Sequence, residues 1–171
     1  RDRSVSRGLG DVYKRQVCDH EVVDLSEIVR RVFRMLVPLA DKTEVRLTAN
    51  LDRGCFVLSM EDDAYQIIFN LVENGIKYNT PGGSVHITIR QKKSSAVLRV
   101  ADTGCGIPEE YRTSVFQPFF RVDKSRSREM GGVGLGLALV REIALLHGGT
   151  VTAEPADGHG TVFTVTLPIQ A

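Results

Sequence analysis

Three segments with helical periodicity, separated by short strand-like runs, limit the folds open to this chain of 171 residues. Apolar residues recur at three-to-four spacing in residues 24–40, 61–78 and 134–147. Asp24 can cap the first segment, and Gly148 suits the position after the last one. The sequence therefore predicts three amphipathic helices.

The runs between these helices have the alternation and flanking turns that are typical of strands. They come in pairs, at residues 44–49 and 55–59, 84–90 and 96–102, and 151–153 and 161–167. The middle pair reads as a β-hairpin. Helices separated by pairs of strands predict an α+β fold, a two-layer α/β sandwich in which a mixed, largely antiparallel sheet carries helices on one face.

Composition narrows the class of protein. With 42% hydrophobic residues, 25% charged residues and a net charge of +1, the chain is typical of a soluble globular domain and gives no reason to expect a nucleic-acid partner. Its three cysteines are far apart, which favours neither a disulfide framework nor a zinc site and indicates a reducing, cytoplasmic setting. No apolar run is long enough for a membrane span, so we expect no membrane contact by these residues, although a longer protein could carry an inner-membrane anchor.

The first sixteen residues differ from the rest. Residues 1–16 are rich in Arg, Ser and Gly and lack sustained apolar periodicity. We interpret them as a non-native or disordered tail, and residues 17–171 as one domain.

The second helix carries a polar stripe. At about 100° per residue, Asn70, Asn74 and Lys77 fall within roughly 60° of one another, opposite the apolar side. Asparagine is a poor helix former, so two of them one turn apart indicate a task other than folding. Two amide oxygens and an ammonium could hold a metal ion and an anionic ligand, but a solvated polar face explains the same stripe.

Two glycine-rich segments are further candidates for a ligand site. Asp102 ends a strand on its buried face and needs a hydrogen-bond donor, and Gly104 and Gly106 follow in a tight turn. Residues 132–137 open the last helix, whose amides and positive dipole end favour phosphate, although a flexible hinge is equally compatible. Between them, residues 121–130 are basic and could form a lid.

Taken in order, these motifs resemble the catalytic and ATP-binding domain of sensor histidine kinases, in the superfamily shared with gyrase, Hsp90 and the mismatch-repair ATPases. The resemblance covers about residues 23–168: residues 70–79 are similar to the N box, 102–108 and 132–137 to the two glycine boxes, and 116–121 to the phenylalanine box. It implies a Bergerat-type fold that binds ATP and Mg²⁺.

The resemblance also implies a role for each site residue. Asn74 would coordinate Mg²⁺, Asn70 would support the metal and phosphates, and Asp102 would accept a hydrogen bond from the adenine amine. Asn70 and Lys77 would be the catalytic residues. The nucleotide-binding residues would be Asn70, Asn74, Lys77, Tyr78, Asp102, Gly104, Gly106, Ile107, Arg121, Gly132, Gly134, Leu135, Gly136, Leu137 and Thr161. Phe119 and Phe120 would anchor the lid, unless they are ordinary core aromatics.

The N box favours a kinase over a hydrolase. ATPases of this superfamily begin it with a glutamate that acts as general base, whereas Asn70 cannot accept a proton at neutral pH. A neutral imidazole needs no such base, because its nitrogen already has a free lone pair.

The acceptor histidine is missing from the chain, since none of the four histidines lies in the Ser-His-Glu context of these kinases: His20, His86, His147 and His159. The expected partners are therefore a dimerisation and histidine-phosphotransfer domain of the same protein and the receiver domain of a response regulator. An anti-sigma-type serine/threonine kinase, or a non-catalytic domain that binds nucleotide or docks a partner, remains the alternative.

Overall fold

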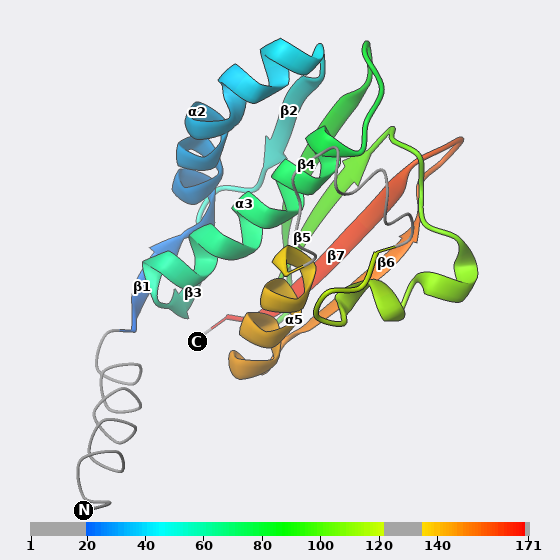
Figure 1. The fold of residues 1–171 in the computed structure, drawn as a ribbon. Coiled ribbons are helices and arrows are strands. Elements are labelled where there is room, and N and C mark those ends of the chain that lie inside the picture. The colour runs from blue at the N-terminus through cyan, green and yellow to red at the C-terminus, as the bar shows by residue number, and fades with distance from the viewer. Residues whose placement is uncertain (1–19, 122–134, 170–171) are drawn as a thin grey trace, which may run out of the picture.

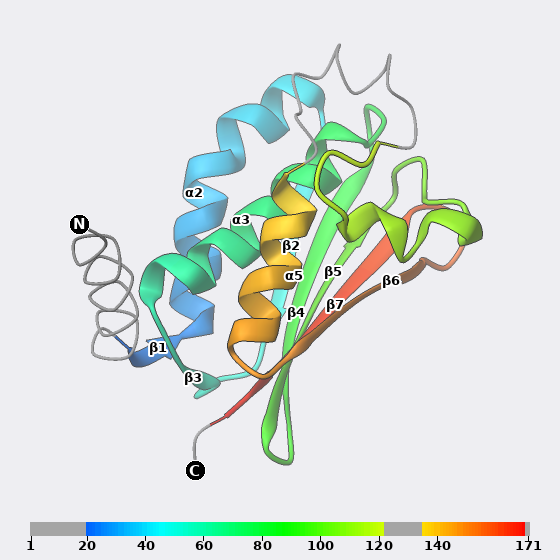
Figure 2. The same cartoon turned by 60° about the horizontal axis from the view of Figure 1, so that its bottom comes forward.

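The computed structural model describes residues 20–121 and 135–169, in which three α-helices cover one face of a five-stranded sheet (Figure 1, Figure 2). Helix α3 (Glu61–Lys77) lies between α2 (Leu25–Thr43) and α5 (Gly136–Leu146). The other face of the sheet carries no helix in Figure 2. The predicted two-layer α+β sandwich is confirmed.

The helices form where the periodicity predicts them. The side chain of Asp24 accepts a hydrogen bond of 3.0 Å from the amide nitrogen of Ser26 and so caps α2, as expected. On α3 the predicted apolar side is buried, with Leu71 and Val72 fully inaccessible to solvent. Helix α2 ends three residues later than expected, and α5 begins at Gly136, two residues after the predicted start.

The main sheet has the order β2-β4-β5-β7-β6. The predicted hairpin is present as β4 (Ser84–Lys92) and β5 (Ser95–Asp102), which pair antiparallel. Strand β7 (Thr161–Pro168) pairs antiparallel with both β5 and β6 (Thr150–Pro155). Strand β2 (Arg46–Leu51) runs parallel to β4, so the sheet is mixed and largely antiparallel.

The structure corrects the prediction of a single sheet. Strand β3 (Phe56–Ser59) leaves the main sheet and pairs antiparallel with β1 (Glu21–Asp24), in a segment that the sequence pattern indicated to be a loop. Both strands have only four residues, too few for a visible alternation. They nevertheless bury side chains, Val23 from β1 and Val57 and Ser59 from β3.

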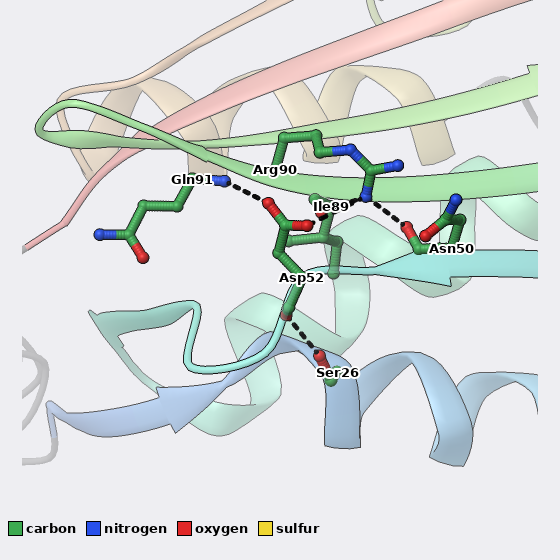
Figure 3. A network of polar contacts seen from close by, with 6 residues as sticks. All are labelled: Ser26, Asn50, Asp52, Ile89, Arg90 and Gln91. Carbon is green, nitrogen blue, oxygen red and sulfur yellow. Dashed lines mark hydrogen bonds and ion pairs between the residues drawn. The ribbon is translucent and has the colours of Figure 1, made fainter.

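A polar network fixes the parallel pairing at the end of β2 (Figure 3). The Asp52 carboxylate accepts a hydrogen bond of 3.2 Å from the Gln91 amide and lies 3.3 Å from Arg90 Nη1. The same guanidinium nitrogen donates to the Asn50 carbonyl at 3.1 Å, and Ser26 Oγ donates to the Asp52 carbonyl at 3.4 Å. The network connects the start of α2 to β2 and β4. It lies at the opposite end of these strands from Asp102, the last residue of β5.

Two 3₁₀ turns, η1 (Glu109–Tyr111) and η2 (Ser114–Phe116), follow β5, and the first begins where Pro108 predicts a short helix. Among the helices that the structure describes, none combines the length and apolar character needed to cross a bilayer.

Candidate nucleotide-binding site

Asp102 is the buried charge around which the candidate site is built. It ends β5, and only 7% of its surface is exposed. Its Oδ1 accepts a hydrogen bond of 2.9 Å from the Gly104 amide and one of 3.3 Å from the Thr161 amide. The expected donor therefore exists within the protein, because two backbone amides hold the carboxylate in place.

The surroundings of Asp102 disfavour its charged form. Burial raises the pKa of the Asp102 carboxyl above its ordinary value, and the amides of Gly104 and Thr161, with nearby His159, only partly offset this rise. Both hydrogen bonds reach Oδ1. A carboxylate held in this way can accept a further hydrogen bond from a ligand, and a ligand donor would favour its charged form.

Two glycines let other backbone segments approach Asp102. Gly160 has a φ of +105°, and a Cβ there would overlap the Asp102 carbonyl oxygen. A Cβ at Gly104 would overlap the carbonyl oxygen of Tyr78, the residue that ends α3. Gly106, at φ +73°, also adopts a backbone conformation that favours glycine.

A polar junction links the end of α3 to the end of β5. Asn79 Nδ2 donates to the Ser84 carbonyl at 2.9 Å, and Thr103 Oγ1 donates to Asn79 Oδ1 at 3.1 Å. Thr103 Oγ1 also accepts from the Ser84 amide at 2.9 Å. The sequence analysis gave Asn79 and Thr103 no role; the position of Asn79 directly after a helix was the available signal.

The predicted stripe lies on one half-buried side of α3. Asn70 Nδ2 donates to the Gln66 carbonyl at 2.7 Å and to Gln66 Oε1 at 3.1 Å. Lys77 Nζ lies 3.1 Å from Glu73 Oε1, and the two side chains are 29% and 28% exposed. The ammonium thus has a carboxylate neighbour that was not foreseen, although their i, i+4 spacing could have shown it.

Helix α3 contacts both of the other candidate segments, but through different sides. A Cβ at Gly136, the first residue of α5, would lie 2.9 Å from Asn70 Oδ1, so the described end of the second glycine box lies against the first asparagine. A Cβ at Gly75 would lie 3.4 Å from the Cβ of Asp102. Gly75 belongs to the buried side of α3, so the helix meets the start of α5 through Asn70 and the buried carboxylate through Gly75.

The remaining predicted residues differ in burial, and some lie outside the described residues. Ile107, Leu137 and Phe120 are half-buried against the core, and Phe120 lies 5.5 Å from the Tyr111 ring. Phe119 is 70% exposed with φ +63°, so it is not a core aromatic. Thr161 is buried, Tyr78 and Arg121 are half-buried, and Leu135 is 42% exposed. Gly132, Gly134 and the basic segment 122–130 lie outside the described residues.

This arrangement suits an elongated ligand with two chemically different ends. A buried carboxylate at one end can accept hydrogen bonds from a base. At the other end, the backbone amides at the N-terminus of the eleven-residue helix α5 can donate to phosphates, and the side-chain amide oxygens of α3 can hold a metal ion. Residues 59–171 match the family model described as histidine kinase-, DNA gyrase B- and HSP90-like ATPase. The chain belongs to that family.

Individual relatives within the family are sensor kinases. The chain is 36% identical over 152 residues to the sensor histidine kinase RppB of Synechocystis, covering 88% of this chain and 34% of RppB. It is 38% identical over 133 residues to WalK of Bacillus subtilis, covering 76% of this chain and 22% of WalK. The chain thus spans about a third or less of these two relatives.

Among solved structures, the catalytic domain of the histidine kinase ThkA superposes with a TM-score of 0.77 at 27% identity, covering 87% of this chain and 95% of that one. The family therefore accounts for both the fold and the order of motifs, and an ATP-binding domain of the histidine kinase type is shown.

Proposed function

We propose that residues 17–171 form the catalytic domain of a sensor histidine kinase that transfers the γ-phosphoryl group of Mg-ATP to a histidine on another domain. The observation that carries the proposal is Asp102, a buried carboxylate held by two backbone amides. No packing requirement explains a buried carboxylate whose charged form is disfavoured, whereas a ligand with a hydrogen-bond donor does.

The base would bind at the Asp102 end. The carboxylate would accept a hydrogen bond from the adenine amine, Thr161 would assist, and Gly104, Gly106 and Ile107 would line the base pocket. The buried position of Thr161 and the hydrogen bond from its amide to Asp102 support this role. Guanine carries a carbonyl oxygen where adenine carries the amine, so an acceptor at this position favours ATP over GTP.

The phosphates would lie between α3 and the start of α5. Asn70, Lys77, Tyr78 and Arg121 would contact them from one side. The backbone amides of the second glycine box would bind from the other, at Gly132, Gly134, Leu135, Gly136 and Leu137. The position of Gly136 against Asn70 Oδ1 supports this arrangement, because it brings the two sides together.

Asn74 would hold Mg²⁺. It is half-buried, one turn from Asn70 and next to Glu73, so its amide oxygen belongs to an oxygen-rich stretch of helix that fits a hard cation. When bound, Mg²⁺ neutralises charge that develops on the phosphates. The protein side chains would keep the nucleotide in line with the acceptor.

Replacement of Asn74 by Ala is expected to weaken Mg-dependent ATP binding by about tenfold or more, because one metal ligand is lost. Titration calorimetry with and without Mg²⁺ measures the effect. Asn50→Ala is the matched control, because Asn50 is exposed on β2 and its carbonyl rather than its side chain bonds Arg90. Unchanged Mg-dependence in Asn74→Ala would contradict the metal role.

Asn70 supports a kinase over a hydrolase. Its amide nitrogen donates to both oxygens of Gln66, which leaves Oδ1 directed at the start of α5. An amide oxygen in this position can support a metal ion beside the phosphates but cannot activate water as a base.

The partners follow from the same proposal. They are a dimerisation and histidine-phosphotransfer domain of the same protein and a response regulator receiver domain, all in the cytoplasm. ThkA has been solved in complex with the response regulator TrrA, which supports this kind of partner.

Incubation of the full-length protein with radiolabelled Mg-ATP tests the reaction. We expect a labelled protein whose label is lost in acid and kept in base, as for phosphohistidine. An acid-stable label would support the serine/threonine kinase alternative, and ATP binding without labelling would support a non-catalytic domain.

A further inference from the structure

His159 is a titratable residue next to Asp102 to which the proposed function gives no role. It lies in the turn between β6 and β7, directly before Gly160. Its Nδ1 is 3.4 Å from the carbonyl oxygen of Gly104. Since a carbonyl only accepts, this nitrogen carries the hydrogen and donates it. His159 thus binds the same glycine whose amide holds Asp102.

The backbone around His159 leaves little freedom to move away from Asp102. Gly160 packs directly on the Asp102 carbonyl, and the Thr161 amide donates to Asp102 Oδ1 at 3.3 Å. Residues 159–161 and 102–104 are therefore joined by contacts at three successive positions. This junction fixes the backbone beside His159, and the bond from Nδ1 to Gly104 orients the ring.

The electrostatic partner of His159 is Asp102. His159 also lines an open pocket of about 270 Å³, together with Thr80, Pro81, Gly82, Gly83, Ser84 and Thr103. His159 is the only ionisable member of this set, since the loop after α3 contributes only uncharged residues. A positive charge on His159 lowers the pKa of Asp102, against the larger effect of burial.

We propose that His159 is a positioning residue for base recognition: it fixes the Gly104 turn that holds Asp102, and its protonated ring supports the charged Asp102 that accepts the adenine amine. This inference rests on the proposed function, because it assigns His159 to the same site. It concerns a residue of this chain outside the boxes of the resemblance.

With His159 in this role, nucleotide binding should persist to a lower pH than it would without the imidazole. When Asp102 gains a proton, it becomes a donor facing the adenine amine and binding weakens. Histidine side chains generally gain their charge at mildly acidic pH, and Asp102, whose pKa is raised by burial, gains its proton as the pH falls. The charged imidazole favours the carboxylate in that range and so moves the loss of binding to lower pH.

The test compares ATP affinity between pH 5 and 8 in the wild type, His159→Gln and His159→Lys. We expect all three within about twofold at pH 8. At pH 5 we expect His159→Gln to bind about three- to tenfold more weakly than wild type, and the permanent cation of His159→Lys to restore the affinity. His86→Gln is the matched control, because it removes an imidazole from β4 whose partner is Thr48.

Superimposable pH profiles for wild type and His159→Gln would overturn the inference. So would His159→Lys behaving like His159→Gln at pH 5, because the charge would then have no part in it. Carboxyl NMR of Asp102 in the nucleotide-free protein separates the two proposals. If wild type binds no ATP at pH 8, the proposed function fails. A higher titration midpoint for the Asp102 carboxyl in His159→Gln than in wild type would still support the inference. An unchanged midpoint would refute it.

Discussion

Replacement of Asp102 by Asn is expected to weaken ATP binding by about 10- to 100-fold at neutral pH. The charged acceptor is lost, and such a hydrogen bond contributes about 1.5–3 kcal/mol. In addition, the Asn side chain can direct its own amide hydrogens at the adenine amine, so that two donors face each other. A fluorescence or calorimetric titration with ATP measures the loss.

The same substitution should leave the nucleotide-free domain as stable as before or more stable. The folded-state pKa of Asp102 is raised, so the folded protein binds the proton more tightly than the unfolded chain. The stability of the wild type therefore falls as the pH rises from the unfolded pKa, about 4, through the folded pKa. The advantage of Asp102→Asn should be absent below that window and full above it.

Urea unfolding of both proteins at several pH values between 3 and 8 checks this sign. A variant that loses ATP binding and stability together at neutral pH would mean that Asp102 is needed for folding. In that case the Asp102 carboxylate would stabilise the fold, and its burial would not indicate a ligand.

Replacement of Gly160 by Ala is expected to cost about 3 kcal/mol or more of the free energy of unfolding and to abolish ATP binding. The new Cβ overlaps the Asp102 carbonyl, and φ +105° is strained for any residue with a side chain. The turn can relieve the overlap only by separating the Thr161 amide from Asp102. Chemical denaturation and ATP titration measure the two effects.

Gly158→Ala in the same turn is the matched control. Gly158 has φ +85° with nothing within 4 Å of a Cβ, so it carries the backbone strain without the overlap and should cost about 1–2 kcal/mol. Equal losses for the two variants would show that the approach of Gly160 to Asp102 is unimportant.

Local patterns predicted most of the fold. The apolar stripe of α3 and the alternation of β4 and β5 depend on neighbours within a few residues, and both are present. Asp24 likewise caps α2 through a bond to Ser26, two residues away. These features are encoded where they occur, so the sequence alone was sufficient.

Pairings between distant segments could not be predicted in this way. The partner of β3 is β1, about thirty residues earlier, and β2 joins β4 in parallel only because α3 returns the chain. Strands of four residues have too few side chains to show which face is buried. A pattern in one segment does not identify its partner.

In the candidate site too, local features could be predicted and contacts between distant segments could not. Asn70, Asn74 and Lys77 could be found from the helical repeat, and the buried end of β5 drew attention to Asp102. One donor to Asp102, Gly104, is two residues away, but the other, Thr161, and the neighbouring His159 and Gly160 are almost sixty residues away. No spacing rule connects such residues, so only the structure shows that they meet.

The most direct test of the account is the affinity of the unmodified chain for Mg-ATP compared with Mg-GTP at neutral pH. Because a charged acceptor would lie opposite the adenine amine, ATP is expected to bind at least about tenfold more tightly than GTP. Equal affinities, or no binding of ATP, would contradict the assignment of Asp102 as the base-recognising residue.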